Sequence, residues 1–168
     1  DGDGNFGDQN VITTAADGAY SVYAADIDGD GDMDVLSASY YDDKIAWYEN
    51  DGIGNFGDQN VITTAADEAY SVYASDLDGD GDMDVLSASK LKGRIAWYEN
   101  LGSGSFGPVQ VITDLPISTT CVYATDLDGD GKGIRVGNNL VCSLPLGLVF
   151  SAQAPFTDNP ASNVRCPV

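Results

Sequence analysis

The sequence contains no histidine and few cations: seven lysines and arginines stand against 27 aspartates and glutamates, for a formal net charge of −20 at pH 7. Without histidine the chain cannot form a Ser-His-Asp or Cys-His catalytic centre, nor the usual zinc sites. The shortage of lysine and arginine argues against nucleic acid, because phosphates are bound through cationic side chains. It argues equally against an anionic membrane surface. We therefore expect neither nucleic acid nor a membrane as a partner.

Long apolar segments, helical periodicity and a cysteine framework are also missing. The longest apolar run, residues 140–150, is far shorter than a membrane span and contains a proline, so we expect no membrane insertion. No segment shows a 3.6-residue apolar period, which predicts that long helices are absent. The three cysteines, Cys121, Cys142 and Cys166, allow one disulfide and one leftover thiol. Residue 1 is not methionine and falls inside a repeat, so we expect a fragment or a processed form.

What the chain has instead is a repeat with a period of 50 residues. Residues 1–50 and 51–100 are identical at 41 of 50 positions without a gap, and residues 101–131 form a third, incomplete copy. Beyond this copy the match stops, and residues 132–168 have a different composition. Because a fixed period is the signature of a repeat architecture, we predict a repeat array over 1–131 and a divergent C-terminal tail over 132–168.

Each period contains four short segments that are typical of β-strands, bounded by glycine, aspartate or asparagine. Four short strands every 40 to 50 residues are the pattern of a β-propeller blade. We therefore predict an all-β fold, a partial β-propeller of about three four-stranded antiparallel blades in which the third blade is degenerate. The strands expected for the first blade are residues 20–25, 35–39, 44–49 and 60–64.

The most informative stretch joins the first two expected strands of the period. It reads Asp-Ile-Asp-Gly-Asp-Gly-Asp-Met-Asp over residues 26–34 and returns over 76–84 with leucine in place of isoleucine. Five carboxylates within nine residues repel one another, and a divalent cation offsets that repulsion. Calcium accepts six to eight oxygen ligands from such a glycine-kinked loop. We predict about two calcium ions, with the carbonyls of Asp32 and Asp82 and water completing two sets of side-chain ligands, Asp26, Asp28, Asp30 and Asp34, and Asp76, Asp78, Asp80 and Asp84.

Related loops are distinguished by their last ligand and their flanks. An EF-hand needs a bidentate glutamate at position twelve and a helix on each side, whereas this loop has Ser37 and Ser87 there and strand-like flanks. The third copy keeps three aspartates, but Lys132 enters the loop and Ile134 replaces the closing carboxylate. We expect a weak or inactive third site at Asp126, Asp128 and Asp130. Residues 1–4 align with a hairpin turn and receive no metal.

The Asp-x-Asp-Gly-Asp-Gly-x-x-Asp loop, together with Phe-Gly turns at Phe6, Phe56 and Phe106, resembles the FG-GAP/VCBS repeat family over residues 1–131. Repeats of this family build the seven-bladed propeller heads of integrin alpha subunits and occur in many secreted proteins. The resemblance implies a calcium-stabilised propeller in an extracellular, secreted or cell-surface protein, often one involved in cell adhesion or associated with carbohydrate. It also implies that the ligand aspartates are those of the two complete loops. Three repeats are too few to close a seven-bladed ring.

Three classes of function remain. The leading hypothesis is a calcium-binding extracellular interaction module of the adhesion type, whose protein or glycan partner the sequence does not name. The first alternative is a lectin-like propeller in which Trp47, Tyr48, Trp97 and Tyr98 stack on sugar rings, and a non-catalytic part of a larger secreted enzyme is another. A carboxylate-based hydrolase or lyase is disfavoured, because no nucleophile, base and orienting group occur together. Because stacked repeats bury their faces against neighbours, we also expect self-association through open blade faces.

Overall fold

A computed structural model describes residues 3–4, 7–114, 118–124, 134–136 and 139–140 of the 168-residue chain. All of its regular elements are β-strands, as the sequence predicted, and the described residues contain no helix that could cross a membrane. In chain order the strands are β1 (Ala19–Ala25), β2 (Asp34–Ser39), β3 (Lys44–Tyr48), β4 (Asn60–Thr63), β5 (Ala69–Ser75), β6 (Asp84–Ser89), β7 (Arg94–Tyr98), β8 (Gln110–Asp114), β9 (Tyr123–Ala124), β10 (Ile134–Val136) and β11 (Asn139–Leu140).

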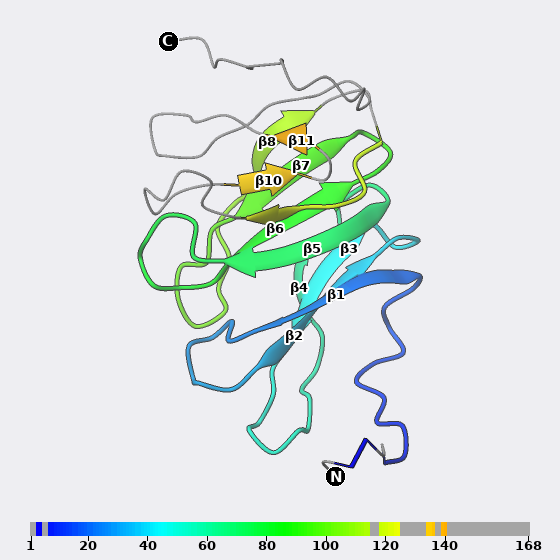
Figure 1. Ribbon diagram of the computed structural model, residues 1–168, viewed down its shortest axis with the longest axis vertical. Coiled ribbons are helices and arrows are strands. Elements are labelled where there is room, and N and C mark those ends of the chain that lie inside the picture. The colour runs from blue at the N-terminus through cyan, green and yellow to red at the C-terminus, as the bar shows by residue number, and fades with distance from the viewer. Residues whose placement is uncertain (1–2, 5–6, 115–117, 125–133, 137–138, 141–168) are drawn as a thin grey trace.

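Two four-stranded antiparallel sheets dominate the molecule, with the strand orders β1-β2-β3-β4 and β5-β6-β7-β8 (Figure 1). Their registers repeat with the sequence: Val35 pairs with Tyr48 in the first sheet, and Val85 pairs with Tyr98 in the second. The four strands expected for the first blade are all present, with ends that agree to within one residue. This arrangement confirms a partial β-propeller.

The fourth strand of each blade comes from the following sequence repeat. β4 pairs with β3 across the boundary between the first two periods, and β8 pairs with β7 in the same way. The first blade therefore runs from β1 to β4, about residues 19–63, and the second from β5 to β8, about residues 69–114. The structural unit is thus offset from the periods 1–50 and 51–100. The Phe-Gly turns fold each repeat end back, because the amides of Gly57 and Gly107 donate to the carbonyls of Glu49 and Glu99.

The third sheet contains the short strands β9, β10 and β11, in the order β11-β10-β9. It has three strands in the described part of the chain, where we expected a degenerate four-stranded blade. β9 lies beside β5, as β5 lies beside β1. The third sheet therefore continues the stack of blades.

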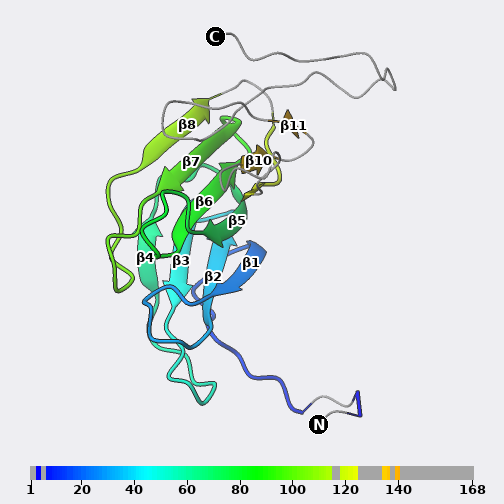
Figure 2. The same cartoon turned by 60° about the vertical axis from the view of Figure 1, so that its left-hand side comes forward.

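The hydrophobic cores lie between the blades rather than within them. Figure 2 shows the two four-stranded sheets that enclose the first of these cores. In the core between the first and second blades, Leu36, Ile45 and Trp47 of the first blade meet Val72 and Val85 of the second. One repeat further on, the equivalent side chains of the second blade meet Val122, which precedes β9. Alternation along each strand explains this pattern, since successive side chains point to opposite faces of a sheet. The second blade thus supplies one face to each of the two cores.

The first strands of successive blades also interact directly. The rings of Tyr20 and Tyr70 lie 4.7 Å apart, as do those of Tyr23 and Tyr73. The amide of Val72 donates to Ser21 Oγ, and the amide of Val122 donates to Ser71 Oγ, each at 3.3 Å. Repetition of one contact at an interval of one repeat shows that each blade packs on the next in the same geometry.

Candidate metal centres

Two acidic loops connect the first and second strands of the two complete blades. The first runs from the end of β1 to the start of β2, and its glycines Gly29 and Gly31 have φ values of 81° and 98°. Gly79 and Gly81 adopt 87° and 99° in the second loop. These values fall in the left-handed region that side chains other than glycine rarely adopt. The glycines therefore permit the tight turn that brings alternate aspartates to one side.

In each loop, three carboxylates come together. Oxygen atoms of Asp26, Asp28 and Asp34 all lie within 4.8 Å of one another, and Asp76, Asp78 and Asp84 form the same group in the second loop. Carboxylate oxygens are the ligands that hard cations such as calcium prefer. The described residues thus contain two acidic clusters that could hold a metal ion.

Backbone amides hold the two half-buried members of the first cluster, Asp26 and Asp28, in place. The amides of Gly29 and Gly31 donate to the two oxygens of Asp26 at 2.8 and 3.1 Å, and the amide of Asp30 donates to Asp28 Oδ1 at 3.2 Å. The second loop repeats all three bonds. Each carboxylate oxygen has two lone pairs, so an amide bond leaves capacity for a cation.

The closing carboxylates are fully buried. Asp34 and Asp84 each have 0% of their surface exposed. Asp34 accepts the amides of Ile27 and Asn50 at 2.9 and 2.8 Å, and Asp84 accepts those of Leu77 and Asn100 at 3.1 and 2.8 Å. A buried charge is costly unless it is paired or bound to a metal. These two buried carboxylates therefore need a compensating cation more than the other aspartates of the loops do.

Burial shifts the acid–base equilibria of the clusters. It raises the pKa of Asp84 to about 6, and repulsion from Asp78 adds to the rise, although the amides of Asn100 and Leu77 oppose it. Burial also raises the pKa of Asp28, where the nearby charges of Asp34, Asp30 and Glu49 act in the same direction. Both groups thus resist ionisation in the absence of a cation, which is the condition that a divalent ion relieves.

The remaining predicted ligands, Asp30 and Asp32 with their equivalents Asp80 and Asp82, lie outside the two clusters. Asp30 is not one of the three clustered carboxylates, and its Oδ1 accepts the amide of Asp32 at 2.8 Å; Asp80 and Asp82 repeat this bond at 2.9 Å. The Asp32 carboxylate lies against Gly52, because a Cβ added there would be 2.5 Å from Oδ2. Its side chain therefore faces the neighbouring turn. The sequence prediction assigns the backbone carbonyl of Asp32, rather than this side chain, to the metal.

The predicted third site, Asp126, Asp128 and Asp130, lies outside the described residues. Sequence reasoning missed Asn50 and Asn100. Their backbone amides donate to the closing carboxylates of the two loops, and their side-chain amides donate to the backbone carbonyls of Met33 and Met83. The signal that could have revealed them is their recurrence one residue after Glu49 and Glu99.

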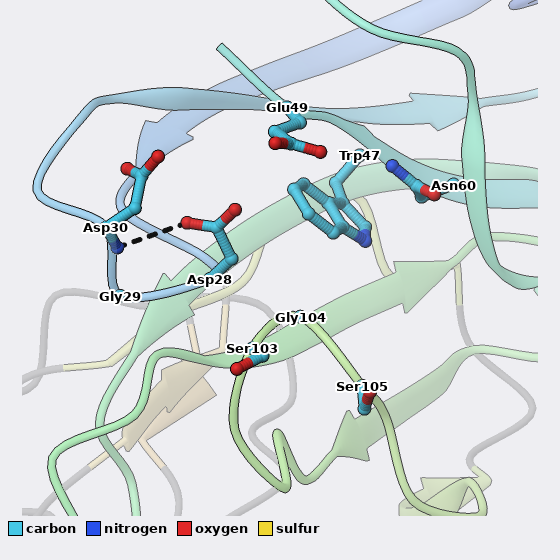
Figure 3. A pocket seen from close by; sticks show the side chains of 9 residues that line it. All are labelled: Asp28, Gly29, Asp30, Trp47, Glu49, Asn60, Ser103, Gly104 and Ser105. Carbon is cyan, nitrogen blue, oxygen red and sulfur yellow. Dashed lines mark hydrogen bonds between the residues drawn. The ribbon is translucent and has the colours of Figure 1, made fainter. Parts of the chain in front are cut away.

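A polar cleft of about 590 Å³ adjoins the first acidic loop (Figure 3). Asp28, Gly29 and Asp30 line it on one side, Trp47, Glu49 and Asn60 line it on the first blade, and the turn 103–105 of the second blade faces them. However, Trp47 and Trp97 are only 6% and 7% exposed, and Tyr48 and Tyr98 are buried. The expected stacking of sugar rings on these four aromatic side chains is therefore wrong, because they pack within and between the blades.

The family model for the FG-GAP-like repeat matches this chain three times, over residues 1–37, 27–87 and 76–133. The matches span the whole array of repeats, so the chain belongs to the FG-GAP-like repeat family. Membership agrees with the resemblance inferred from the aspartate loops and the Phe-Gly turns. The protein is thus an FG-GAP repeat module with a β-propeller architecture.

No curated protein matches the sequence significantly. Among solved structures, the chain is similar to a lectin from Agrocybe aegerita, described as specifically recognising non-reducing terminal N-acetylglucosamine, with 23% sequence identity and a TM-score of 0.49. The match covers 67% of this chain and 33% of the lectin chain.

Proposed function

We propose that this protein is an extracellular interaction module whose first two blades are stabilised by calcium. One ion binds in each acidic loop, coordinated by Asp26, Asp28 and Asp34 in the first, with Asp30 and the carbonyl of Asp32 as further ligands. The equivalent residues, Asp76, Asp78, Asp80, Asp82 and Asp84, bind the second ion. The protein has a structural and adhesive role in which the propeller surface contacts a protein or glycan partner, and it carries out no catalysis.

The observation that carries this proposal is the convergence of three carboxylates in each loop, one of them fully buried. Like charges this close to one another oppose the compact state. The two buried carboxylates have backbone amides but no cationic side chain among their hydrogen-bond partners in the described residues. The donor set is made entirely of oxygen, which suits calcium better than zinc or copper.

Calcium in these loops would supply two positive charges at the point where β1 turns into β2 and β5 turns into β6. Binding would couple to folding, because the unfolded chain does not hold the carboxylates together. Calcium modules outside cells bind in the range of about 10⁻⁴ to 10⁻³ M, which matches millimolar extracellular calcium. Loops of this kind would therefore be loaded with calcium outside the cell, where the proposal places the protein.

Calorimetric titration of the full chain with calcium tests the proposal, and we expect about two sites. At ten times the dissociation constant each site adds about 1.4 kcal/mol to the free energy of unfolding, so chelation should lower the melting temperature. Asp28→Asn should remove one site. Asp58→Asn, an exposed aspartate outside the clusters, is the matched control and should remove none. No heat of binding together with no thermal effect of the chelator would refute the proposal.

A second candidate function rests on the cleft beside the first loop. Its lining combines the edge of an indole with carboxylate, amide and hydroxyl groups, the mixture that fixes the orientation of a small hydroxylated ligand such as a sugar. Titration with neutral monosaccharides, followed by NMR shifts of Asn60 and Ser105, tests this function. Asn60→Ala should weaken the shifts, whereas Asn10→Ala, at the equivalent position of the preceding repeat, should not. Unchanged spectra at millimolar sugar would remove the candidate.

A further inference from the structure

A series of three hydrogen bonds joins the two acidic loops across the boundary between the blades. The amide of Ile27 donates to Asp34 Oδ2 at 2.9 Å. The carbonyl of Ile27 accepts Asn100 Nδ2 at 2.8 Å, and the backbone amide of Asn100 donates to Asp84 Oδ1 at 2.8 Å. The series therefore begins on the closing carboxylate of the first loop and ends on that of the second.

Every residue of this series is withdrawn from solvent. Asp34, Asp84 and Asn100 have 0% of their surface exposed, and Ile27 has 1%. A hydrogen bond in such surroundings is electrostatically stronger than one in water, and an unpaired donor or acceptor there is costly. Because these bonds cannot be exchanged for bonds to solvent, a change in position at one carboxylate also displaces the groups that are bonded to it.

The side chain of Asn100 contacts both loops at once. A side-chain amide carries two donor hydrogens. Asn100 Nδ2 donates to the carbonyl of Ile27 in the first loop and, at 3.1 Å, to the carbonyl of Met83 in the second. Asn100 Oδ1 accepts the amide of Gly102 at 3.1 Å, so both polar atoms of the side chain are paired. The side chain is thus fixed in one orientation between the loops.

Ile27 carries this contact to the first cluster of carboxylates. It lies in the sequence between Asp26 and Asp28, two of the three clustered aspartates. Its side chain belongs to the core between the blades, against which Met83 of the second loop also packs. The backbone on both sides of Ile27 therefore takes its position partly from the second blade, and whatever fixes Ile27 also fixes the two carboxylates beside it.

The equivalent asparagine of the first blade provides a contrast. The amide of Asn50 donates to Asp34 at 2.8 Å and its side chain donates to the carbonyl of Met33 at 3.0 Å. These are the bonds that Asn100 makes within its own loop. Among the described residues, Asn50 makes no such bond to a neighbouring blade. Asn50 thus holds one loop, whereas Asn100 holds two.

From this arrangement we infer that Asn100 couples the two candidate calcium sites, so that each binds its ion more tightly when the other is occupied. The inference rests on the proposed function, because it assigns a regulation to the same two sites. An ion held by Asp84 orders Asn100, whose side chain then holds Ile27 and the aspartates on either side of it. Because the conformational entropy of these groups is lost only once, the next ion binds to a loop that is already ordered. Linkage makes the effect equal in both directions.

Direct repulsion between two bound cations has the opposite sign. It weakens the second binding step, and salt screens it over about 8 Å at physiological ionic strength. Coupling through Asn100 strengthens the second step and changes little with salt, because the hydrogen bonds that carry it are buried. The sign of the coupling and its salt dependence therefore separate the two effects.

Calorimetric titration with calcium tests the inference on three forms of the full chain. These are the unaltered chain, Asp28→Asn, which keeps only the second site, and Asp78→Asn, which keeps only the first. The product of the two association constants of the unaltered chain should exceed the product of the two single-site constants by about fivefold or more, at low and at high salt. A ratio of one or less, with two ions bound, overturns the coupling and leaves the proposed function standing. Absence of binding heat in all three forms overturns both.

Two further substitutions assign the coupling to one side chain. Asn100→Ala, introduced into the same three forms, keeps the backbone amide that donates to Asp84 but removes the bond to Ile27, so the ratio should fall to about one. Asn50→Ala removes the equivalent bonds within the first loop and should keep the ratio, even where the affinity of the first site falls. A ratio that survives Asn100→Ala would overturn the role of Asn100.

NMR spectra of the two single-site forms give a second readout that does not depend on the folding of Asn100→Ala. In Asp28→Asn, calcium binds in the second blade, and the amide resonance of Ile27 in the first should shift in step with saturation. In Asp78→Asn, the side-chain amide resonances of Asn100 should shift as the first site fills. Resonances that stay unchanged in both titrations, while calcium binds, would rule out the coupling.

Discussion

The first and second blades have almost the same sequence but different surroundings. The sheets share their register, and the acidic loops share every backbone hydrogen bond to their aspartates. Nevertheless Val22 is 69% exposed and Val72 is 3% exposed. Both residues are valines at the same position of strands that differ only at their last residue, Ala25 in β1 and Ser75 in β5. The difference in exposure therefore comes from what lies beside the blade.

This contrast separates two kinds of information in the repeat. Strand pairing and loop conformation are determined within about 50 residues, because both blades adopt them despite their different neighbours. Burial is determined by the adjacent repeat, which supplies the other half of each core. Stability of this family is therefore a property of neighbouring pairs, and matched substitutions in the two blades can measure it.

The largest expected difference concerns the valine on the first strand of each blade. Val72→Asp places an unpaired charge in the core between the blades and should lower the free energy of unfolding by about 3 kcal/mol or more. Val22→Asp should change it by less than about 0.5 kcal/mol, because the side chain remains in solvent. Urea denaturation in calcium measures both values. Equal losses would show that the open face of the first blade is covered in solution.

A second difference is expected in the pH dependence of the chain without calcium. The pKa of Asp84 is about 6 in the folded protein, above its value of about 4 in an unfolded chain. The folded state therefore binds the proton more tightly, and stability should fall by about 2 kcal/mol as pH rises from 4 to 7. Melting in chelator measures the trend at pH values across this range. Asp84→Asn should remove this contribution, whereas Asp58→Asn should retain it.

Calcium should reverse that trend. The ion binds ionised carboxylates, so protons compete with it, and the stability of the calcium-bound chain should rise over the same pH range. A chain whose stability falls with pH in both chelator and calcium would indicate that the ion does not bind at Asp84.

Much of the fold could be predicted from the sequence because its signals are local. Turn residues and short β-branched segments placed the strands of the first blade to within one residue, and the period predicted the repeated blades. The packing between blades could not be predicted in the same way. This packing depends on which neighbouring blade the side chains of Leu36 and Val72 meet. Repeats of nearly identical sequence give no sign that the face of one of them is exposed.

The candidate site was predictable to a similar depth. The spacing of the aspartates identified both loops, and the clustered carboxylates in each belong to the predicted set. The complete burial of Asp34 and Asp84 was not predicted, because charge patterns alone indicate solvent. The part played by Asn50 and Asn100 was also missed, since an asparagine sixteen residues beyond the closing aspartate meets it only through the fold of the sheet.

A third comparison uses the glycines of the turns that follow β3 and β7. Gly54 and Gly104 both have positive φ values, 86° and 66°, so an alanine is strained at either position. At Gly104 the added methyl would also overlap the indole of Trp47 in the first blade. Gly104→Ala should therefore cost about 1 to 3 kcal/mol more than Gly54→Ala. Thermal unfolding of the two variants gives the difference, and the Trp fluorescence of Gly104→Ala should change as the indole is displaced.

The smallest expected difference belongs to the two asparagines. Each side chain donates to a carbonyl of its own loop, at Met33 or Met83, and each accepts the amide of a following glycine. Asn100 alone also donates across the blade boundary, to the carbonyl of Ile27. Asn50 alone accepts the amide of Gly54, at 3.2 Å, but this bond is exposed to solvent, whereas the bond from Asn100 to Ile27 is buried. Asn100→Ala should therefore cost about 1 kcal/mol more than Asn50→Ala. Chemical denaturation of the two variants resolves that difference, and equal losses would show that the bond across the blade boundary contributes nothing to stability.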